Sequence, residues 1–319
     1  MRDTAINQYY IDYIDEDLSY LLGLIVARGT IEYMNGVIEI VFPYRYLEID
    51  NVSVWPSIVS SIATRIERRL QELGFETELQ ASKESRNIIL KLSTKPSSII
   101  MRVLKMHLMG RTNYREFTVP RIILELAEKK EKGYFNIVTE FLRGYCDVAA
   151  HIRKSNADPK KFHRVYVDVL FSNWRLPVQL CKLFRSLDVR PHTITWGHPN
   201  LRDPKALKGP SFWKKEHQIK IYAHDFLKIG FTIIHKQQLL KEYARENENR
   251  LHSGEKPYFK PCNGRVRRRK RVPEHPGEND VELPTEIRGK HFNHFTEICR
   301  AMGCELANGR YPTFLKFLR

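Results

Sequence analysis

The chain has 319 residues, and its 53 Lys and Arg against 37 Asp and Glu give a formal net charge of +16. A hydrophobic content of 42% is typical of a globular protein, and the length allows two domains or one pseudo-symmetric domain with an extension. The positive charge favours a polyanionic partner, most commonly nucleic acid, over a soluble protein that is merely basic.

The cysteine content and the hydropathy of the chain indicate where the protein is located. Five cysteines in a chain of this size do not indicate a disulfide framework, so we expect a reducing, intracellular location, either cytoplasm or nucleoid. The first 17 residues carry several acids and no apolar run, so we expect no signal peptide. No run approaches about 20 uninterrupted apolar residues, so we expect neither a transmembrane helix nor a membrane partner.

The first half opens with an apolar helix and a hairpin. The helix covers residues 20–29, and the alternating runs 30–34 and 37–41 follow it. Asn35-Gly36 lies between these runs, and Asn-Gly in that position is the strongest short signal of a β-hairpin.

An amphipathic helix is expected next, over residues 57–73, and Gly74 is suited to end it. Its apolar residues stand at strict four-residue intervals: Ile58, Ile62, Ile66 and Leu70. Residues 75–80 and 87–92 then predict a second hairpin, and residues 97–109 predict a closing helix.

The second half repeats this order, which indicates an internal duplication. Its expected elements are a helix at 135–148, strands at 151–156 and 165–171, a helix at 175–187, strands at 193–196 and 218–223, and closing helices at 224–229 and 236–246. The sequence therefore predicts an α+β fold of two pseudo-symmetric αββαββα halves, each with an antiparallel sheet covered on one face.

The halves are joined by an expected helix whose first turn suits Pro120. We predict a first half at 1–115, a connecting helix at 116–133, a second half at 134–249 and a basic C-terminal extension at 250–319. The extension has little periodicity and one short expected helix, at residues 290–302.

Two ten-residue segments resemble each other: YLLGLIVARG at residues 20–29 and FLRGYCDVAA at residues 141–150. Both resemble the motif helix of the LAGLIDADG homing-endonuclease family, and the resemblance to its single-chain, two-motif members extends over about residues 12–248. It implies that the two helices pack against each other at a pseudo-twofold axis through small residues. The residues at these packing positions are Gly23, Ala27, Gly144 and Val148.

In that family the eighth motif residue is an acid that binds a divalent metal. Here the two equivalent positions hold Arg28 and Ala149. Arginine remains cationic and only donates hydrogen bonds, and alanine has no ligating side-chain atom. The resemblance thus implies a DNA-binding scaffold without its usual metal ligands, and Arg28 is suited to contact a phosphate instead.

The alternative is an active, Mg²⁺-dependent endonuclease of homing or restriction type, with Glu32 and Asp147 as displaced catalytic acids. Asp147 stands at the sixth motif position, which is usually structural, and lies about 200° around the helix from Ala149. Glu32 lies beyond the motif, in the first expected strand. If the protein is inactive, no cofactor is expected.

The resemblance also implies that each sheet is a saddle whose outward side chains face the major groove of DNA. The basic candidates for DNA contact are Arg28, Arg45, Lys83, Arg86, Lys91, Lys95, Arg153, Lys154, Lys160, Lys161, Arg164, Lys214, Lys215 and Lys220. Glu32, Tyr33, Glu39 and Gln80 are the other outward candidates on the first sheet. Each of these has the alternative of being a solvated surface residue.

The extension carries a basic run and a group of Cys and His residues. The run consists of Arg265, Arg267, Arg268, Arg269, Lys270 and Arg271, which suits a DNA-binding arm or a nuclear import patch. The candidate zinc ligands are Cys262, His291, His294, Cys299 and Cys304. Their spacing matches no known zinc finger, and a small satellite core with surface histidines is the alternative.

Taken together, the sequence predicts a monomeric, sequence-specific protein that binds double-stranded DNA on an endonuclease scaffold and does not cleave it. Two alternatives stay open. One is the Mg²⁺-dependent nuclease, and the other is an RNA-binding protein that assists splicing, with structured RNA as its partner.

Overall fold

The computed structural model describes most of residues 14–257 and one short strand beyond them. The described residues are 14–44, 55–82, 86–130, 133–153, 162–170, 173, 175–199, 215–257 and 305–306. None of the helices in these ranges is long and apolar enough to cross a membrane.

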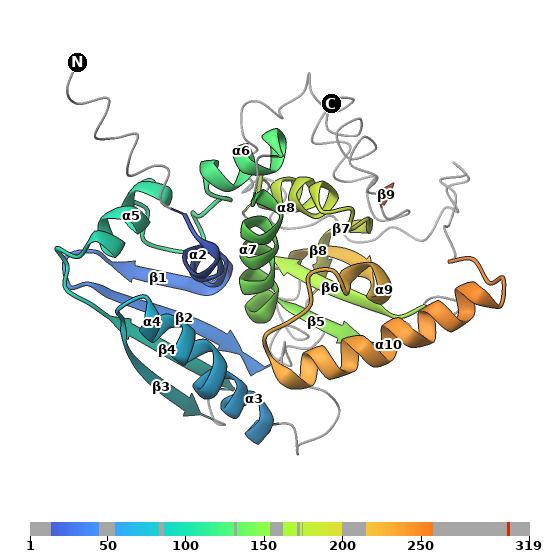
Figure 1. The fold of residues 1–319 in the computed structure, drawn as a ribbon, viewed down its shortest axis with the longest axis horizontal. Helices are drawn as coiled ribbons and strands as arrows, with labels where there is room; N and C mark the ends of the chain where they lie inside the picture. Colours follow the sequence, from blue (N-terminus) through green and yellow to red (C-terminus); the bar gives the residue numbers. More distant parts are fainter. Residues whose placement is uncertain are drawn as a thin grey trace, which may run out of the picture.

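The first half builds one four-stranded antiparallel sheet (Figure 1). Its elements are α2 (Glu16–Arg28), β1 (Gly29–Glu32), β2 (Val37–Pro43), α3 (Trp55–Ser61), a π-helical stretch (Ile62–Glu67), α4 (Arg68–Glu72), β3 (Glu76–Ser82), β4 (Asn87–Ser93) and α5 (Ile99–His107). The strands lie in the order β1-β2-β4-β3.

The second half repeats the arrangement after a connecting helix, α6 (Arg121–Lys129). Its elements are α7 (Tyr134–Ala149), β5 (Ala150–Arg153), β6 (Arg164–Val169), α8 (Arg175–Ser186), β7 (Pro191–Pro199), β8 (Lys215–Tyr222), α9 (Ala223–Phe226) and α10 (Ile234–His252). The order β5-β6-β8-β7 matches that of the first sheet, so the predicted α+β fold with two similar halves is confirmed.

One strand was not expected. β9 (Glu305–Leu306) pairs in parallel with β7 and adds a fifth strand to the edge of the second sheet. The predicted helix at 290–302, the basic run and the candidate zinc ligands lie outside the described residues.

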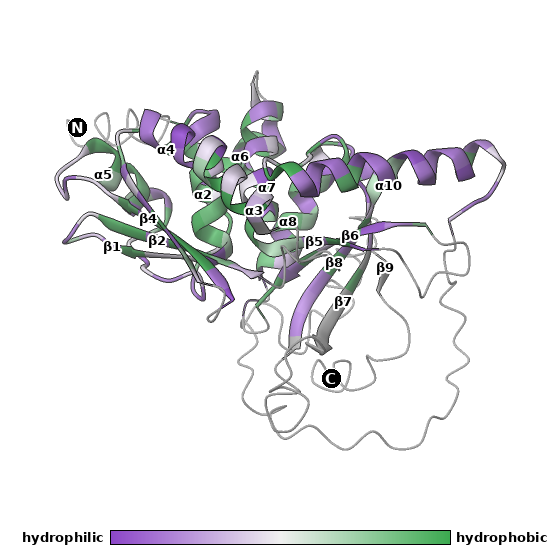
Figure 2. Cartoon of the chain, turned by 90° about the horizontal axis from the view of Figure 1, so that it is seen from below, coloured by the Kyte–Doolittle hydropathy of each residue, from purple (hydrophilic) through white to green (hydrophobic). Residues whose placement is uncertain are grey.

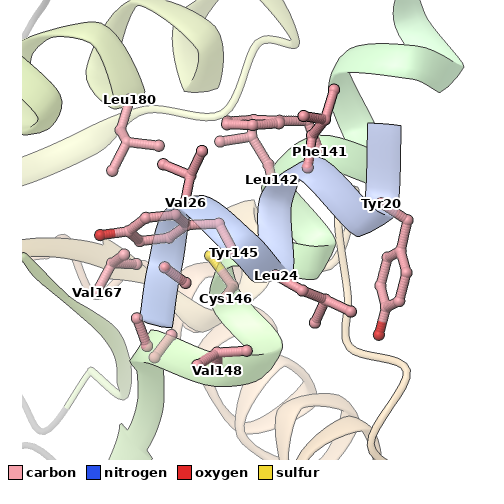
Figure 3. Packing of buried hydrophobic residues seen from close by; sticks show 14 of the residues in the cluster. Tyr20, Leu24, Val26, Phe141, Leu142, Tyr145, Cys146, Val148, Val167 and Leu180 are labelled. Carbon is pink, nitrogen blue, oxygen red and sulfur yellow. The ribbon is translucent and has the colours of Figure 1, made fainter. Parts of the chain in front are cut away.

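The axis of the molecule is the contact between α2 and α7 (Figure 3). Asp15 caps the N-terminus of α2, and its side chain accepts a hydrogen bond from the Leu18 backbone N–H at 2.7 Å. From Leu18 to Arg28 every residue of α2 is buried, so the helix is surrounded by protein. This accounts for its almost uninterrupted apolar sequence.

Two glycines set the distance between these helices. A Cβ atom on Gly23 would lie 2.2 Å from the Phe141 carbonyl oxygen, and a Cβ atom on Gly144 would lie 2.2 Å from the Tyr20 carbonyl oxygen. Tyr20 and Phe141 occupy equivalent motif positions, so the contact is reciprocal across the pseudo-twofold axis. Because backbone meets backbone here, no side-chain rotation can make room for a methyl group.

The strict four-residue spacing of apolar residues from α3 to α4 has a structural consequence. Four residues turn an ideal α-helix by about 400°, so such a stripe drifts by about 40° at each step. The π-helical stretch Ile62–Glu67 has wider turns and opposes this drift. Ile58, Ile62, Ile66 and Leu70 are consequently all buried.

Both sheets have one face packed against helices and one open face. In Figure 2 the long helices lie along one side of the molecule and the two sheets along the other. On β2, Ile38, Ile40 and Phe42 point into the core and alternate with the more accessible Val37, Glu39 and Val41. The two open faces are the surfaces on which a DNA contact is expected.

We predict that Gly23→Ala and Gly144→Ala each lower the free energy of unfolding by more than about 3 kcal/mol, because the added methyl forces the helix backbones apart. Urea denaturation measures this. Gly74→Ala is the control: no atom lies within 4 Å of the position that its new methyl group would take, and its positive φ of 84° costs only about 1–2 kcal/mol. Equal losses in all three variants would contradict the close helix contact.

Candidate nucleic-acid interface

The ends of the two motif helices meet the sheets at the centre of the molecule. Arg28 is the last residue of α2 and Ala149 the last of α7, and both are buried. The next residues, Gly29 and Ala150, have extended backbone and begin β1 and β5. Each helix therefore delivers its eighth motif residue to the point where a sheet starts.

Arg28 is held by groups from two different parts of the chain. Its Nη2 donates a hydrogen bond to Oε1 of Glu216, on β8 of the second half, at 3.2 Å. Its guanidinium carbon lies 5.4 Å from the ring centre of Tyr114, which follows α5. Both members of the ion pair are largely shielded from water, with side-chain exposures of 9% and 16%. The pair thus ties the end of α2 to the opposite sheet.

The positive charge of Arg28 affects the pKa of Tyr114. Burial alone would raise the pKa of this phenol, but the guanidinium groups of Arg28 and Arg115 outweigh it and lower the pKa. A fixed positive charge therefore occupies the place where the family resemblance implies a carboxylate.

The residues at the helix ends do not fit a divalent metal. Arg28 offers only donors and is already paired with a carboxylate, and Ala149 offers no ligating atom. Within the described ranges, no group of three or more His, Cys, Asp or Glu residues could hold a metal ion.

Asp147, one of the two candidate displaced acids, is fully buried and saturated with donors. Its carboxylate accepts hydrogen bonds from the Tyr20 hydroxyl at 2.7 Å and from the backbone N–H groups of Thr232, at 3.1 and 3.2 Å, and Ile233, at 3.5 Å. The acid therefore joins α2 to the segment that leads into α10. This is the arrangement of a structural acid.

Lys236 packs beside Asp147 and binds the end of the same helix. Its Nζ donates to the backbone oxygens of Cys146 and Asp147, both at 2.9 Å. Burial raises the pKa of the Asp147 carboxyl, and the Lys236 ammonium opposes that shift. Burial also lowers the pKa of Lys236 to about 8, against the opposing charge of Asp147.

Glu32, the other candidate acid, lies elsewhere. It is exposed at the far end of β1, roughly 10 Å along the strand from Gly29, and accepts a hydrogen bond from Asn35 in the hairpin turn at 3.0 Å. The structure places Glu32 and Asp147 in separate environments: Glu32 is exposed at the end of β1, and Asp147 is buried between α2 and the segment before α10. The catalytic role of either stays a prediction.

The DNA-contact candidates fall into three groups. Lys91, Arg153, Arg164 and Lys220 lie on strands and on the open faces, and Arg86 lies in the β3–β4 hairpin with its guanidinium 5.6 Å from the Tyr44 ring. Lys215 belongs to β8, but its side chain is not described. Outside the described residues lie the DNA-contact candidates Arg45, Lys83, Lys154, Lys160, Lys161, Lys214, Arg265, Arg267, Arg268, Arg269, Lys270 and Arg271. The candidate zinc ligands Cys262, His291, His294, Cys299 and Cys304 also lie there.

Two residues that matter at the centre were not predicted from the sequence. Glu216 stands in a basic stretch, where nothing indicated a partner for Arg28 on the other half. Tyr114 follows a predicted helix in a segment without periodicity. Both contacts depend on distant segments meeting at the axis. Only the alternation of polar and apolar residues on β8 hinted that Glu216 faces outward.

Comparison with known proteins gives a limited result. No family model and no curated protein matches the chain. Among solved structures, mesophilic variants of the homing endonuclease I-DmoI align with a TM-score of 0.33 and 16% identity, over 67% of this chain and 86% of that chain. I-DmoI in complex with DNA and Mn aligns with a TM-score of 0.33 and 14% identity, over 70% and 96%.

A variant of I-SmaMI aligns with a TM-score of 0.33 and 11% identity, over 74% of this chain and 93% of that chain. TM-scores of this size are too low to carry an argument. The architecture therefore rests on the reciprocal helix contact and on the matching strand order of the two sheets.

We predict that Arg28 and Glu216 are coupled by about 1–3 kcal/mol in a double-mutant cycle of Arg28→Met and Glu216→Gln, because each substitution alone leaves a poorly solvated partner. Unfolding free energies of the four proteins give the coupling. The control cycle is Arg121 with Glu125, an i, i+4 pair whose arginine is 90% exposed. It is expected to give at most about 0.5 kcal/mol. Additive losses at Arg28 and Glu216 would exclude a coupled pair.

We also predict that Asp147→Asn lowers the free energy of unfolding by about 2 kcal/mol or more. The carboxylate accepts hydrogen bonds with both oxygens, whereas an amide would turn an N–H group toward some of the same donors. Glu32→Gln, at an exposed position, is expected to change it by less than about 0.5 kcal/mol. Thermal and urea unfolding measure both. An Asp147→Asn protein as stable as the unaltered one would contradict the structural role.

Proposed function

We propose that the protein is a monomeric, sequence-specific binder of double-stranded DNA that does not cleave it. The observation that supports this most is the pairing of Arg28 with Glu216 at the end of α2, since the end of α7 holds Ala149 and the family resemblance implies a metal-binding acid at both ends. A buried cation opposes divalent metal binding there, while the two open sheet faces are retained.

The geometry of the sheets suits duplex DNA. The major groove is about 12 Å wide and admits a two-stranded β-ribbon, and outward side chains on such strands reach base edges and phosphates. Two sheets related by a pseudo-twofold axis match two half-sites on one duplex. The net charge of +16 supports a polyanionic partner. The division into parts at 1–115, 116–133, 134–249 and 250–319 stays a prediction.

One experiment separates the open alternatives. The protein is incubated with a randomised duplex library, with and without Mg²⁺, and both bound and cut molecules are sequenced. We expect enrichment of a site of roughly 15–20 base pairs with no cut ends. Cut ends that appear only with Mg²⁺ would establish the nuclease instead.

A parallel binding measurement with structured RNA tests the splicing alternative. Tighter binding to a folded RNA than to the enriched duplex, at the same salt concentration, would overturn the DNA assignment. A protein that binds neither nucleic acid would overturn both.

A further inference from the structure

The two open sheet faces have opposite electrostatic character. Among the described strands of the first sheet, Lys91 is the one Lys or Arg residue, against the acids Glu32, Glu39, Glu76 and Glu78. In the second sheet, β5 to β9, the bases are Arg153, Arg164, Lys215 and Lys220, and the acids are Asp168, Glu216 and Glu305.

Strand register shows that the four acids of the first sheet share one face. Glu39 lies opposite Lys91, and Lys91 lies opposite Glu78, so the three form a row across β2, β4 and β3. The neighbouring row, through Glu32, Val37, Ser93 and Glu76, ends in an acid on each side. Directly opposed side chains are about 4.5–5.5 Å apart at Cβ, so two carboxylates offset the charge of Lys91.

The equivalent row of the second sheet has its one acid, Glu305 of β9, two strands away from the lysine of that row. It begins, like the first, at the second residue of the strand that follows the motif helix, and runs through His151, Tyr166, Lys220 and Thr193. Lys220 therefore occupies the position that Lys91 has in the first sheet. Its register partners on the two adjacent strands are Tyr166 and Thr193, where Lys91 has two glutamates.

Aromatic rings hold the cations of the second face in place. The charged groups of Arg153 and Lys220 lie 5.9 and 5.8 Å from the ring centre of Tyr166, and the Arg164 guanidinium lies 5.2 Å from that of Tyr222. Such contacts orient the charged groups of these three side chains.

Asp168 and Glu216, the acids on β6 and β8, have partners of their own. Asp168 accepts a hydrogen bond from Gln218 at 2.8 Å and lies 3.5 Å from the His151 ring nitrogen, and Glu216 is paired with Arg28. The cationic character of the face also acts on His192. Burial, followed by the charges of Arg164 and Lys220, lowers its pKa to about 3.

Taking duplex binding as the proposed function, we propose that the two halves divide the task unequally. The second half holds DNA phosphates through Arg153, Arg164 and Lys220. The first half contributes little phosphate affinity and instead reads base edges with its glutamates. A carboxylate only accepts hydrogen bonds, and cytosine presents the N4 amino donor that Glu recognises in the major groove. Cytosine is therefore expected at positions facing Glu39 and Glu78.

The matched pair Lys220→Ala and Lys91→Ala tests the phosphate contribution, because the two lysines are equivalent in register. Binding to a random-sequence duplex is measured between about 50 and 200 mM salt. We expect Lys220→Ala to reduce the slope of log K against log salt by about 0.9, as for one lost phosphate contact, and Lys91→Ala to change it by less than half as much. Equal changes in both variants would overturn the division.

The reading of bases by the first half is tested with Glu39→Gln and Glu78→Gln, on the enriched duplex and on its cytosine substitutions. We expect tighter binding to random duplex, because a negative charge near phosphates is removed, together with a loss of cytosine preference of roughly tenfold. Unchanged preference would overturn this part. Unfolding temperatures check that each variant folds, and Lys220→Gln replaces Lys220→Ala if the latter does not.

Failure of the division is distinct from failure of the proposed function. If the unaltered protein binds no duplex at about 50 mM salt, duplex binding itself is wrong. If it binds duplex and the two lysine variants behave alike, only the unequal division is wrong.

Discussion

The rest of the structure depends on the close backbone contact between α2 and α7. Gly23 and Gly144 each face a carbonyl oxygen of the opposite helix at a distance that leaves no room for a methyl group. This contact fixes where the helix ends lie, and the first strand of each sheet starts from those ends. The positions of both sheets, and hence of both open faces, follow from a contact made of main-chain atoms.

Charged groups then secure the two ends of this helix pair. Near the start of α2, Arg69 donates to Asp17 and to Glu140 of α7, and Glu140 is also paired with Arg143. Near its end, Arg28 is paired with Glu216. Asp147 of α7 joins Tyr20 of α2 to the segment that leads into α10. Polar side chains thus connect the two halves at several levels of the axis, where a purely apolar contact would allow the helices to slide.

Under the proposed function, the centre of the molecule and its two sheet faces have different parts in binding DNA. At the centre, Arg28 (paired with Glu216) and Ala149 stand where the family resemblance implies metal-binding carboxylates. These residues oppose metal-dependent cleavage, while the arrangement of helices and sheets is kept. On the faces, the two sheets share one order of their first four strands but carry different side chains, so the two halves present unlike surfaces. The buried residues maintain the same backbone arrangement in both halves, whereas the residues on the open faces do not affect it and can therefore differ.

The sequence by itself determined the repeated helix–hairpin order of the two halves, because this order depends on local periodicity and on turn residues such as Asn35-Gly36. The resemblance of the two motif segments to a known family implied the glycines at the axis. Tertiary structure decided the rest. The pairing of Arg28 with Glu216, the burial of Asp147 and the row of Glu39, Lys91 and Glu78 all join residues far apart in the chain. Charge in the sequence gives only a total, and strand register decides which charges meet on one face.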